Sequence, residues 1–302
     1  MSPSIKSLLS YASSLLLPQI PISNPPGNDV PSSSSSSYYA PLSGAPACPI
    51  DGPMSCHNST APSDSCCFVY PGGRMLLTQF WDTHTTHGGG EEDWTLHGLW
   101  PDLCDGTYDQ FCHMTPSYRN VTEILQNYGQ EELLGFMNRY WLANYGPNSR
   151  LWEHEFNKHG TCINTLAPSC YGEGHKPGQE VVDYFARAAA LFKMLDTFYA
   201  LEKAGITPHG RKHYPLADVQ KALEGYSGGK VVLRCIPGGR GSHHNDVLHE
   251  AWYVYFVKGS LQTGQFVPAQ NLGKEGDAGN CAPWVRYLPK RSRSTTMGEE
   301  DL

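Results

Sequence analysis

The chain has 302 residues, with 22 Lys or Arg against 29 Asp or Glu, so its formal net charge is −7 with histidine neutral. This balance argues against a protein that holds nucleic acid by bulk charge, because such domains carry a basic excess or stripe. A hydrophobic fraction of 39% and a charged fraction of 17% exclude disorder of the whole chain. Runs of about 18 uninterrupted apolar residues do not occur, so the sequence predicts no membrane-spanning helix.

The first 47 residues are predicted to precede the folded domain. Residues 1–22 place Lys6 before a short leucine-rich region, which resembles a secretory signal, although serines and Pro18 interrupt it. An amphipathic surface stretch is the alternative for this segment. Residues 23–47 are rich in Pro and Ser, with serines at every position of 32–37, and are predicted to form an unstructured linker.

One domain is expected from residue 48 to 288, because the composition is steady there and shows no second linker or repeat. Strands at both ends and helices in the middle predict the α+β class. Residues 289–302 are basic and then acidic and are predicted to be a disordered tail. In chain order, the predicted elements are strands at 75–81 and 94–98, helices at 121–140 with a possible break at Gly129, at 151–162 and at 181–204, and strands at 230–235 and 251–257.

The cysteines predict an oxidising compartment. They are even in number and form no C-x-x-C pair or zinc spacing, so a disulfide framework is favoured over a metal site. Adjacent Cys66 and Cys67 are not expected to bond each other, and about 945 pairings of ten cysteines stay open on spacing alone. Sequons at Asn58 and Asn120 agree with a secretory route. The ten cysteines are Cys48, Cys56, Cys66, Cys67, Cys104, Cys112, Cys162, Cys170, Cys235 and Cys281.

The first segment with chemical potential is Trp-Thr-Leu-His-Gly-Leu-Trp-Pro at 94–101. Alternation along a strand puts Thr95 and His97 on one face. We expect this strand to end at Gly98. His97 would then project at the rim of a sheet, where a ligand can reach it.

The second segment is the predicted helix at 151–162. Glu155, Lys158 and His159 fall at i, i+3 and i+4, and His154 lies four residues before Lys158. One turn of helix therefore offers a carboxylate, an ammonium and two imidazoles on overlapping faces.

This segment has two other interpretations. A solvated face with i, i+4 charge pairs is the structural alternative, with Trp152 and Phe156 on the packing side. A zinc protease is suggested by His-Glu-x-x at 154–157, but Lys158 stands where the second metal-binding histidine is required. The zinc site is therefore excluded.

Displacement at phosphorus is the chemistry that suits these groups. Two histidines from separate elements can serve as acid and base, because a reference pKa of about 6.5 lets one be charged and the other neutral in mildly acidic water. Lys158 could neutralise charge on a phosphoryl group, and Glu155 could orient or stabilise an imidazole.

The two segments together resemble the active-site signatures of the ribonuclease T2 family, acid endoribonucleases of fungi, plants and animals. The matching motifs are His-Gly-Leu-Trp-Pro at 97–101 and Trp-Glu-His-Glu-x-x-Lys-His-Gly-Thr-Cys at 152–162, in the family's order. The similarity spans most of the chain from 48 to 281. The cysteine count and the Cys66-Cys67 doublet resemble the fungal branch.

This resemblance implies a single disulfide-rich α+β domain, with a central antiparallel sheet flanked by helices. It implies that His97 is the general acid toward the leaving 5′-oxygen and His159 the general base toward the ribose 2′-hydroxyl. Glu155 and Lys158 would stabilise the phosphorane, and His154 would help to hold the phosphate. The first product is a 2′,3′-cyclic phosphate, and no metal or other cofactor is required.

Single-stranded RNA is the substrate that the resemblance implies, and DNA is excluded because it lacks the attacking 2′-hydroxyl. Trp100, Asp102 and Tyr108 correspond to a base pocket in similar fungal enzymes. Two aromatic faces stack any base and one carboxylate accepts from an exocyclic amine, so we expect low base specificity with adenine the candidate preference. Core packing is the alternative role for Trp100.

The family's disulfide pattern would also resolve the cysteine pairing. Small departures from its motifs, at 94–96 and at Phe156, keep size and apolarity and leave catalysis intact. The implied pairs are Cys48–Cys67, Cys56–Cys104, Cys66–Cys170, Cys112–Cys162 and Cys235–Cys281.

We therefore expect a secreted or vacuolar endoribonuclease that acts as a monomer away from the membrane. A catalytically idle RNA-binding glycoprotein on the same fold is one alternative, and a phosphoesterase of small cyclic nucleotides is another.

Overall fold

A computed structural model describes residues 44–45, 47–57, 64–83, 89–239, 244–272 and 278–290. The predicted signal at 1–22, most of the linker at 23–47, residues 291–302 of the tail and the sequon at Asn58 lie outside these residues. The described part falls within one compact unit.

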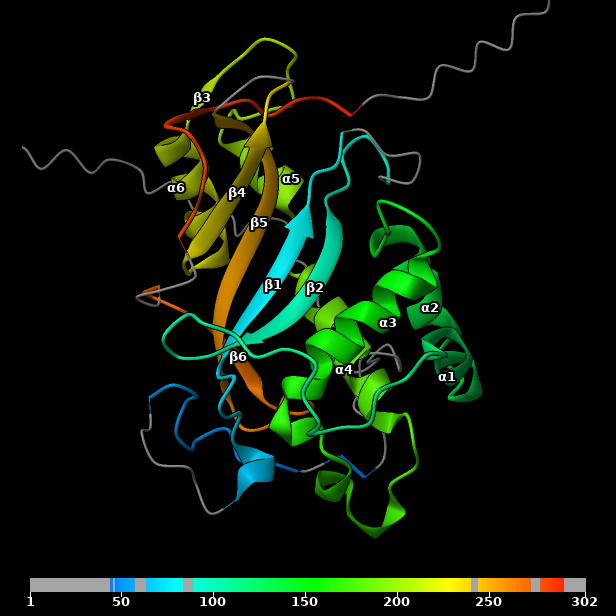
Figure 1. Cartoon of the computed structure of the whole chain (residues 1–302). Helices are drawn as coiled ribbons and strands as arrows, with labels where there is room; N and C mark the ends of the chain where they lie inside the picture. The colour runs from blue at the N-terminus through cyan, green and yellow to red at the C-terminus, as the bar shows by residue number, and fades with distance from the viewer. Residues whose placement is uncertain are drawn as a thin grey trace, which may run out of the picture. The chain divides into compact units, whose positions relative to one another are not determined.

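In the described part, an antiparallel sheet of five strands is combined with helices from the middle of the chain, which confirms the α+β class (Figure 1). The strands are β1 Arg74–Phe80, β2 Thr95–Asp102, β4 Val231–Pro237, β5 Asn245–Lys258 and β6 Gln265–Pro268, with a separate short pair of β3 Tyr214–Pro215 and β7 Trp284–Val285. The α-helices are α1 Val121–Asn127, α2 Glu131–Tyr140, α3 Asn148–Lys158, α4 Gln179–Lys193, α5 Thr197–Lys203 and α6 Leu216–Ser227. Short 3₁₀ turns are η2 Ser65–Cys67, η3 Gly160–Cys162, η4 Asn164–Leu166 and η5 Pro168–Gly174.

The sheet has the order β2-β1-β5-β4, and β6 pairs with the far end of β5. Every residue of β1 is buried, because the strand is covered on both faces. Met75 and Leu77 enter the main core, where α4 packs against β1 and β2. Leu76 points the other way, into a smaller cluster with Val254 and Phe256. Alternating side chains of one strand thus supply two cores.

The helices lie to either side of this sheet. Figure 1 shows α1 to α4 gathered next to β2, while α5 and α6 lie by β4. The central helix α4 is buried over most of its length. Three of its buried positions are alanines, at 186, 188 and 189, and small side chains let a helix approach the sheet closely.

Two predicted helices differ from the observed ones. The expected break at Gly129 occurs, and φ there is +67°. The helix predicted at 181–204 is wrong as a single element, because the chain turns between α4 and α5. Asp196 caps α5 there by accepting a hydrogen bond from the Tyr199 backbone N–H. The helix predicted at 151–162 begins earlier and ends at Lys158, and η3 follows it.

The strand β2 does not end at Gly98, as expected, but continues to Asp102. Leu96 pairs with Gln79 and Gly98 pairs with Thr78, so one extra residue lies between them in a β-bulge. Because β2 is an edge strand, the proline at 101 costs no ladder hydrogen bond.

Five disulfide bonds cross-link the described domain, and they are the pairs that the resemblance implies. They are Cys48–Cys67, Cys56–Cys104, Cys66–Cys170, Cys112–Cys162 and Cys235–Cys281.

Asn120 belongs to the sequon that the structure describes. It is exposed at the N-cap of α1, and its side chain donates a hydrogen bond to Glu123. Glycosylation at Asn120 stays a prediction.

Candidate active site

The bulge in β2 is what places His97. Residues three apart on a regular strand point to opposite faces. Here the extra residue lets His97 and Trp100 share a face, and their ring centroids are 4.8 Å apart. The His97 imidazole also stacks on Phe80 of β1, at 4.0 Å and 20°. Its backbone carbonyl accepts a hydrogen bond of 2.7 Å from the Trp141 indole. Both the ring and the backbone of His97 are therefore held.

Two carboxylates flank the His97 ring. Glu155 Oε1 from α3 lies 3.6 Å from Nε2, and Glu250 Oε1 from β5 lies 3.4 Å from Nδ1. The side chain of Glu155 is 1% exposed, that of Glu250 13% and that of His97 21%. The His97 ring thus lies between two nearly buried carboxylates.

Trp100 links this histidine to the second one. Its indole N–H donates a hydrogen bond of 2.8 Å to Glu155 Oε2. Its ring stacks on His159, with centroids 5.0 Å apart and an interplanar angle of 19°. The two histidines that are distant in sequence thus both contact one tryptophan.

The end of α3 positions His159. This residue caps the helix, and its backbone N–H donates to the Glu155 carbonyl at 3.0 Å. The side chain is buried, and within the described residues neither ring nitrogen has a hydrogen-bond partner. Burial first, then the charges of Lys158 and His97, lower the pKa of His159 to about 2. The imidazole is therefore neutral in mildly acidic solution, as a general base must be.

Burial also acts on Glu155, in the opposite direction. Desolvation raises the pKa of this fully buried carboxyl, although the His97 charge and the Trp100 hydrogen bond oppose the rise. Burial thus disfavours the charged form of this carboxyl, while its neighbours favour it.

His154 and Lys158 flank the same end of α3. His154 is exposed on the helix surface, and its ring centroid lies 6.1 Å from that of Phe111. Burial of part of its ring, and then the charges of Lys158 and His97, lower the pKa of His154. Lys158 is half-buried at the last position of the helix. The α3 face that was expected to hold Glu155, Lys158 and His159 therefore exists, but two of its groups are buried rather than solvated.

The three residues of the implied base pocket also lie together. Trp100 and Asp102 are two apart on β2 and share a face. Asp102 is buried opposite Arg74 of β1 and forms a β-bridge with Tyr108, whose side chain is 56% exposed. One face of Trp100 is already stacked on His159, so a base would meet the remaining surface of the indole. Their role in base binding stays a prediction.

Gly98 is required by this arrangement. A Cβ at this position would overlap the Glu155 carboxylate and the Trp100 indole N–H. We expect Gly98→Ala to lower kcat/KM by about a hundredfold, because displacement of reactive groups by about 1 Å has that effect. The measurement is kcat/KM on RNA together with the melting temperature.

Gly135→Ala is the matched control. Gly135 lies inside α2 with open space around it, so the same substitution there removes only helix flexibility. Stability should rise by about 0.5–1 kcal/mol with activity unchanged. Equal activity of the two variants would contradict the packing argument for Gly98.

Other parts of the described structure offer no comparable site. No group of three or more His, Cys, Asp or Glu side chains in the described ranges is arranged to hold a metal ion. Over the same ranges, no helix is both long and apolar enough to cross a bilayer.

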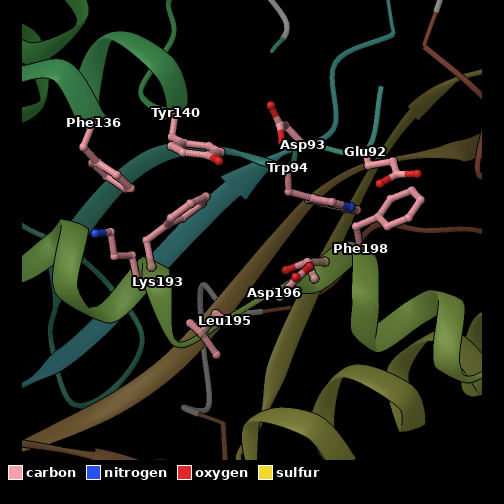
Figure 2. Close-up of a pocket in the computed structure, with 11 residues that line it drawn as sticks. Glu92, Asp93, Trp94, Phe136, Tyr140, Lys193, Leu195, Asp196 and Phe198 are labelled. Atoms are coloured by element: carbon pink, nitrogen blue, oxygen red, sulfur yellow. The ribbon is translucent and has the colours of Figure 1, made fainter. Parts of the chain in front are cut away.

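A cavity of about 320 Å³ lies among α2, α4 and α5 (Figure 2). Figure 2 shows aromatic walls that include Phe136, Tyr140 and Phe198. Two carboxylates that line the cavity already have partners. Asp93 pairs with Arg139 at 3.0 Å, and Asp196 caps α5. None of the predicted catalytic residues lines this cavity.

Sequence reasoning missed Glu250, Phe80 and Trp252. Phe80 lies within the predicted strand at 75–81, but nothing local assigns it to His97. Glu250 immediately precedes the predicted strand at 251–257. A carboxylate directly before a run of aromatic and aliphatic strand residues was the available signal, since Glu is depleted in strands.

Comparison with known proteins places the same region in one family. The profile described as the Ribonuclease T2 family matches residues 72–271. Ribonuclease T2 of Aspergillus oryzae is 46% identical over 253 residues, which cover 83% of this chain and 87% of that protein. Ribonuclease Trv of Hypocrea rufa is 45% identical over 244 residues, which cover 81% of this chain and 98% of that protein. The crystal structure of Actibind, a T2 ribonuclease, matches with a TM-score of 0.72 at 40% identity. The match covers 81% of this chain and 98% of that chain.

Proposed function

The chain belongs to the ribonuclease T2 family and is an endoribonuclease, and we propose that His97 and His159 are its general acid and general base. The observation that carries this assignment is the shared contact of both rings with Trp100. A neutral, buried His159 and a His97 between two carboxylates suit the two opposite roles.

The reaction is a transphosphorylation within the RNA strand. His159 takes the proton of the ribose 2′-hydroxyl, and the 2′-oxygen forms a bond to phosphorus. The bond from phosphorus to the 5′-oxygen breaks, and His97 gives its proton to that oxygen. The products are a 2′,3′-cyclic phosphate end and a 5′-hydroxyl end, and each histidine has changed protonation state.

Lys158 and Glu155 serve the pentacovalent transition state. The ammonium of Lys158, at the end of α3, offsets negative charge on the phosphoryl oxygens. Glu155 contacts His97 and Trp100 at once, so it stabilises the charged acid and holds the indole between the two histidines. His154, on the exposed side of the same helix turn, helps to hold the phosphate.

The substrate is single-stranded RNA with little base preference. Trp100 and Tyr108 offer aromatic surface, and we assign the carboxylate of Asp102, which is buried beside them, as the acceptor for an exocyclic amine. DNA is not cleaved because it lacks the attacking hydroxyl. We propose that the protein acts as a monomer. We also propose a secretory destination, outside the cell or in the vacuole, and five disulfides support it.

The decisive experiment uses a DNA oligonucleotide that contains one ribonucleotide. At about pH 5, we expect cleavage only on the 3′ side of the ribonucleotide, with a 2′,3′-cyclic phosphate on the upstream product, because attack needs a 2′-hydroxyl next to the phosphate. EDTA should leave the rate unchanged.

The same assay separates the alternatives. An RNA-binding protein without activity would retain the oligonucleotide without cutting it. A phosphoesterase of small nucleotides would hydrolyse 2′,3′-cyclic mononucleotides and leave the polymer intact. Cuts at deoxyribonucleotides, or full inhibition by EDTA, would overturn the mechanism.

A further inference from the structure

The group next to His97 that the mechanism leaves unused is Glu250. This residue lies in β5, far from both active-site segments in the sequence. The strand β1 pairs with β2 on one side and with β5 on the other. Phe80, which stacks on His97, is the direct register partner of Glu250. The sheet itself therefore brings this carboxylate to the histidine.

The Glu250 carboxylate is fixed from two sides. One oxygen, Oε1, lies 3.4 Å from His97 Nδ1. The other oxygen, Oε2, accepts a hydrogen bond of 2.7 Å from the Trp252 indole N–H. Trp252 is held in turn against Trp100, with ring centroids 5.3 Å apart. The position of Glu250 is thus defined by the same aromatic residues that surround the two histidines.

Positive charge on two neighbouring histidines favours an ionised Glu250, whereas the nearby Glu155 carboxylate of α3 opposes it. His97 faces it from β2, and His249 precedes it on β5. Arg234 of β4 is its register partner on the other side, and the guanidinium lies over the Trp252 ring. Burial opposes charge on this carboxyl, but the attraction of the His97 ring and the hydrogen bond from the Trp252 indole outweigh it and hold the Glu250 pKa below its ordinary value. The surroundings of Glu250 therefore favour its ionised form.

Glu155 is a different kind of neighbour, because it faces the other nitrogen of the ring. It lies 3.6 Å from Nε2, on the side that also meets Trp100 and the end of α3. The pKa of Glu155 is raised by burial, whereas that of Glu250 is lowered. The two carboxylates therefore lie at opposite nitrogens of the His97 ring. Glu155 lies at Nε2, on the substrate side, and Glu250 lies at Nδ1, on the side of the sheet.

We propose that Glu250 is the positioning residue of the general acid. Its carboxylate holds the Nδ1–H of His97, so that Nε2 is the nitrogen that delivers the proton to the leaving 5′-oxygen. Glu250 stays ionised through the reaction and never touches the substrate. This inference rests on the proposed role of His97, and it adds a histidine–carboxylate pair that neither active-site segment contains.

The test is the pH profile of Glu250→Gln, an isosteric change that removes the charge. With the negative charge gone, the protonated ring is disfavoured, and the alkaline limb of kcat should move to lower pH by about one unit. At the pH of maximum activity, kcat should fall about ten- to a hundredfold, since loss of an orienting partner has effects of this size. KM should change little, because Glu250 does not meet RNA. Glu250→Asp keeps the charge and should restore the position of the limb.

Glu180→Gln is the matched control. Glu180 is buried in α4 and pairs with His175 at 2.9 Å, so this change breaks a second carboxylate–histidine pair. It should lower the melting temperature and leave the alkaline limb of kcat in place. If Glu180→Gln moved the limb as far as Glu250→Gln, a general loss of structure would explain both, and the inference would fail.

A direct titration separates this inference from the proposed function. In protein labelled with ¹⁵N-histidine, the His97 signals are assigned by their loss in His97→Phe. Glu250→Gln should move the titration of His97 to lower pH and reduce the population with a proton on Nδ1. If the wild-type protein cleaves RNA but the His97 signals are unchanged in Glu250→Gln, the role of Glu250 alone would be overturned. Lack of cleavage by the wild type would overturn the proposed function instead.

Discussion

Replacement of His97 by phenylalanine should lower kcat on RNA by about two to four powers of ten. The phenyl ring keeps the stacking with Phe80, so the strand and its bulge are preserved. What is lost is the proton for the 5′-oxygen, a poor leaving group that departs slowly as an alkoxide. Steady-state kinetics on a dinucleotide, with circular dichroism to verify folding, measure the effect.

A general acid is recognised by how strongly the effect of its removal on the rate depends on the leaving group. A nucleoside 3′-(4-nitrophenyl phosphate) carries a leaving group that needs no proton. His97→Phe should therefore recover most of the lost rate on this substrate relative to the wild type. An equal loss on both substrates would assign His97 to another step. His213→Phe, at an exposed histidine before β3, should leave both rates unchanged.

Replacement of His159 by phenylalanine should have an effect of similar size, but on both substrates. The base acts on the 2′-hydroxyl before any leaving group departs, so a better leaving group cannot compensate for its loss. Relative rates on the dinucleotide and on the nitrophenyl ester give the answer. Recovery on the ester would show that the two histidine roles are exchanged.

Stability should behave differently in the two histidine variants. His159 is buried and neutral, and within the described residues its ring nitrogens have no hydrogen-bond partner. A phenyl ring keeps the stack on Trp100 and removes two desolvated polar atoms, so the melting temperature of His159→Phe should not fall. In His97→Phe, by contrast, Glu155 and Glu250 lose their shared partner, and a modest loss of stability is expected.

The local chemistry of the site could be predicted from sequence, because its residues lie in two short segments. The spacing of Glu155, Lys158 and His159 places them on one side of a helix turn, and the structure has them there. Burial of that side could not be predicted, since the same spacing fits a solvated face. It arises because β2 and Trp100 cover the helix end.

Contacts between strands could not be predicted from a local sequence pattern. The role of Phe80 and Glu250 depends on the register of β1 with its two neighbours, and one residue of slip would turn both side chains away. The end predicted at Gly98 was wrong for a related reason. Glycine is a common terminator of strands, but here it belongs to a bulge within β2 and admits the Glu155 carboxylate. The break before α5 did have a local signal, the capping Asp196.

The disulfide between Cys112 and Cys162 ties the position of His159 to the redox state of its surroundings. Cys162 lies in η3, and its backbone N–H donates to the His159 carbonyl. Cys112 follows Phe111, whose N–H donates to the Lys158 carbonyl at 2.9 Å. The covalent bond thus fastens both sides of the end of α3. Glutathione and thioredoxin keep thiols reduced in the cytosol. A chain folded there would lack this fastening, so the fixed position of the end of α3 belongs to the oxidised protein.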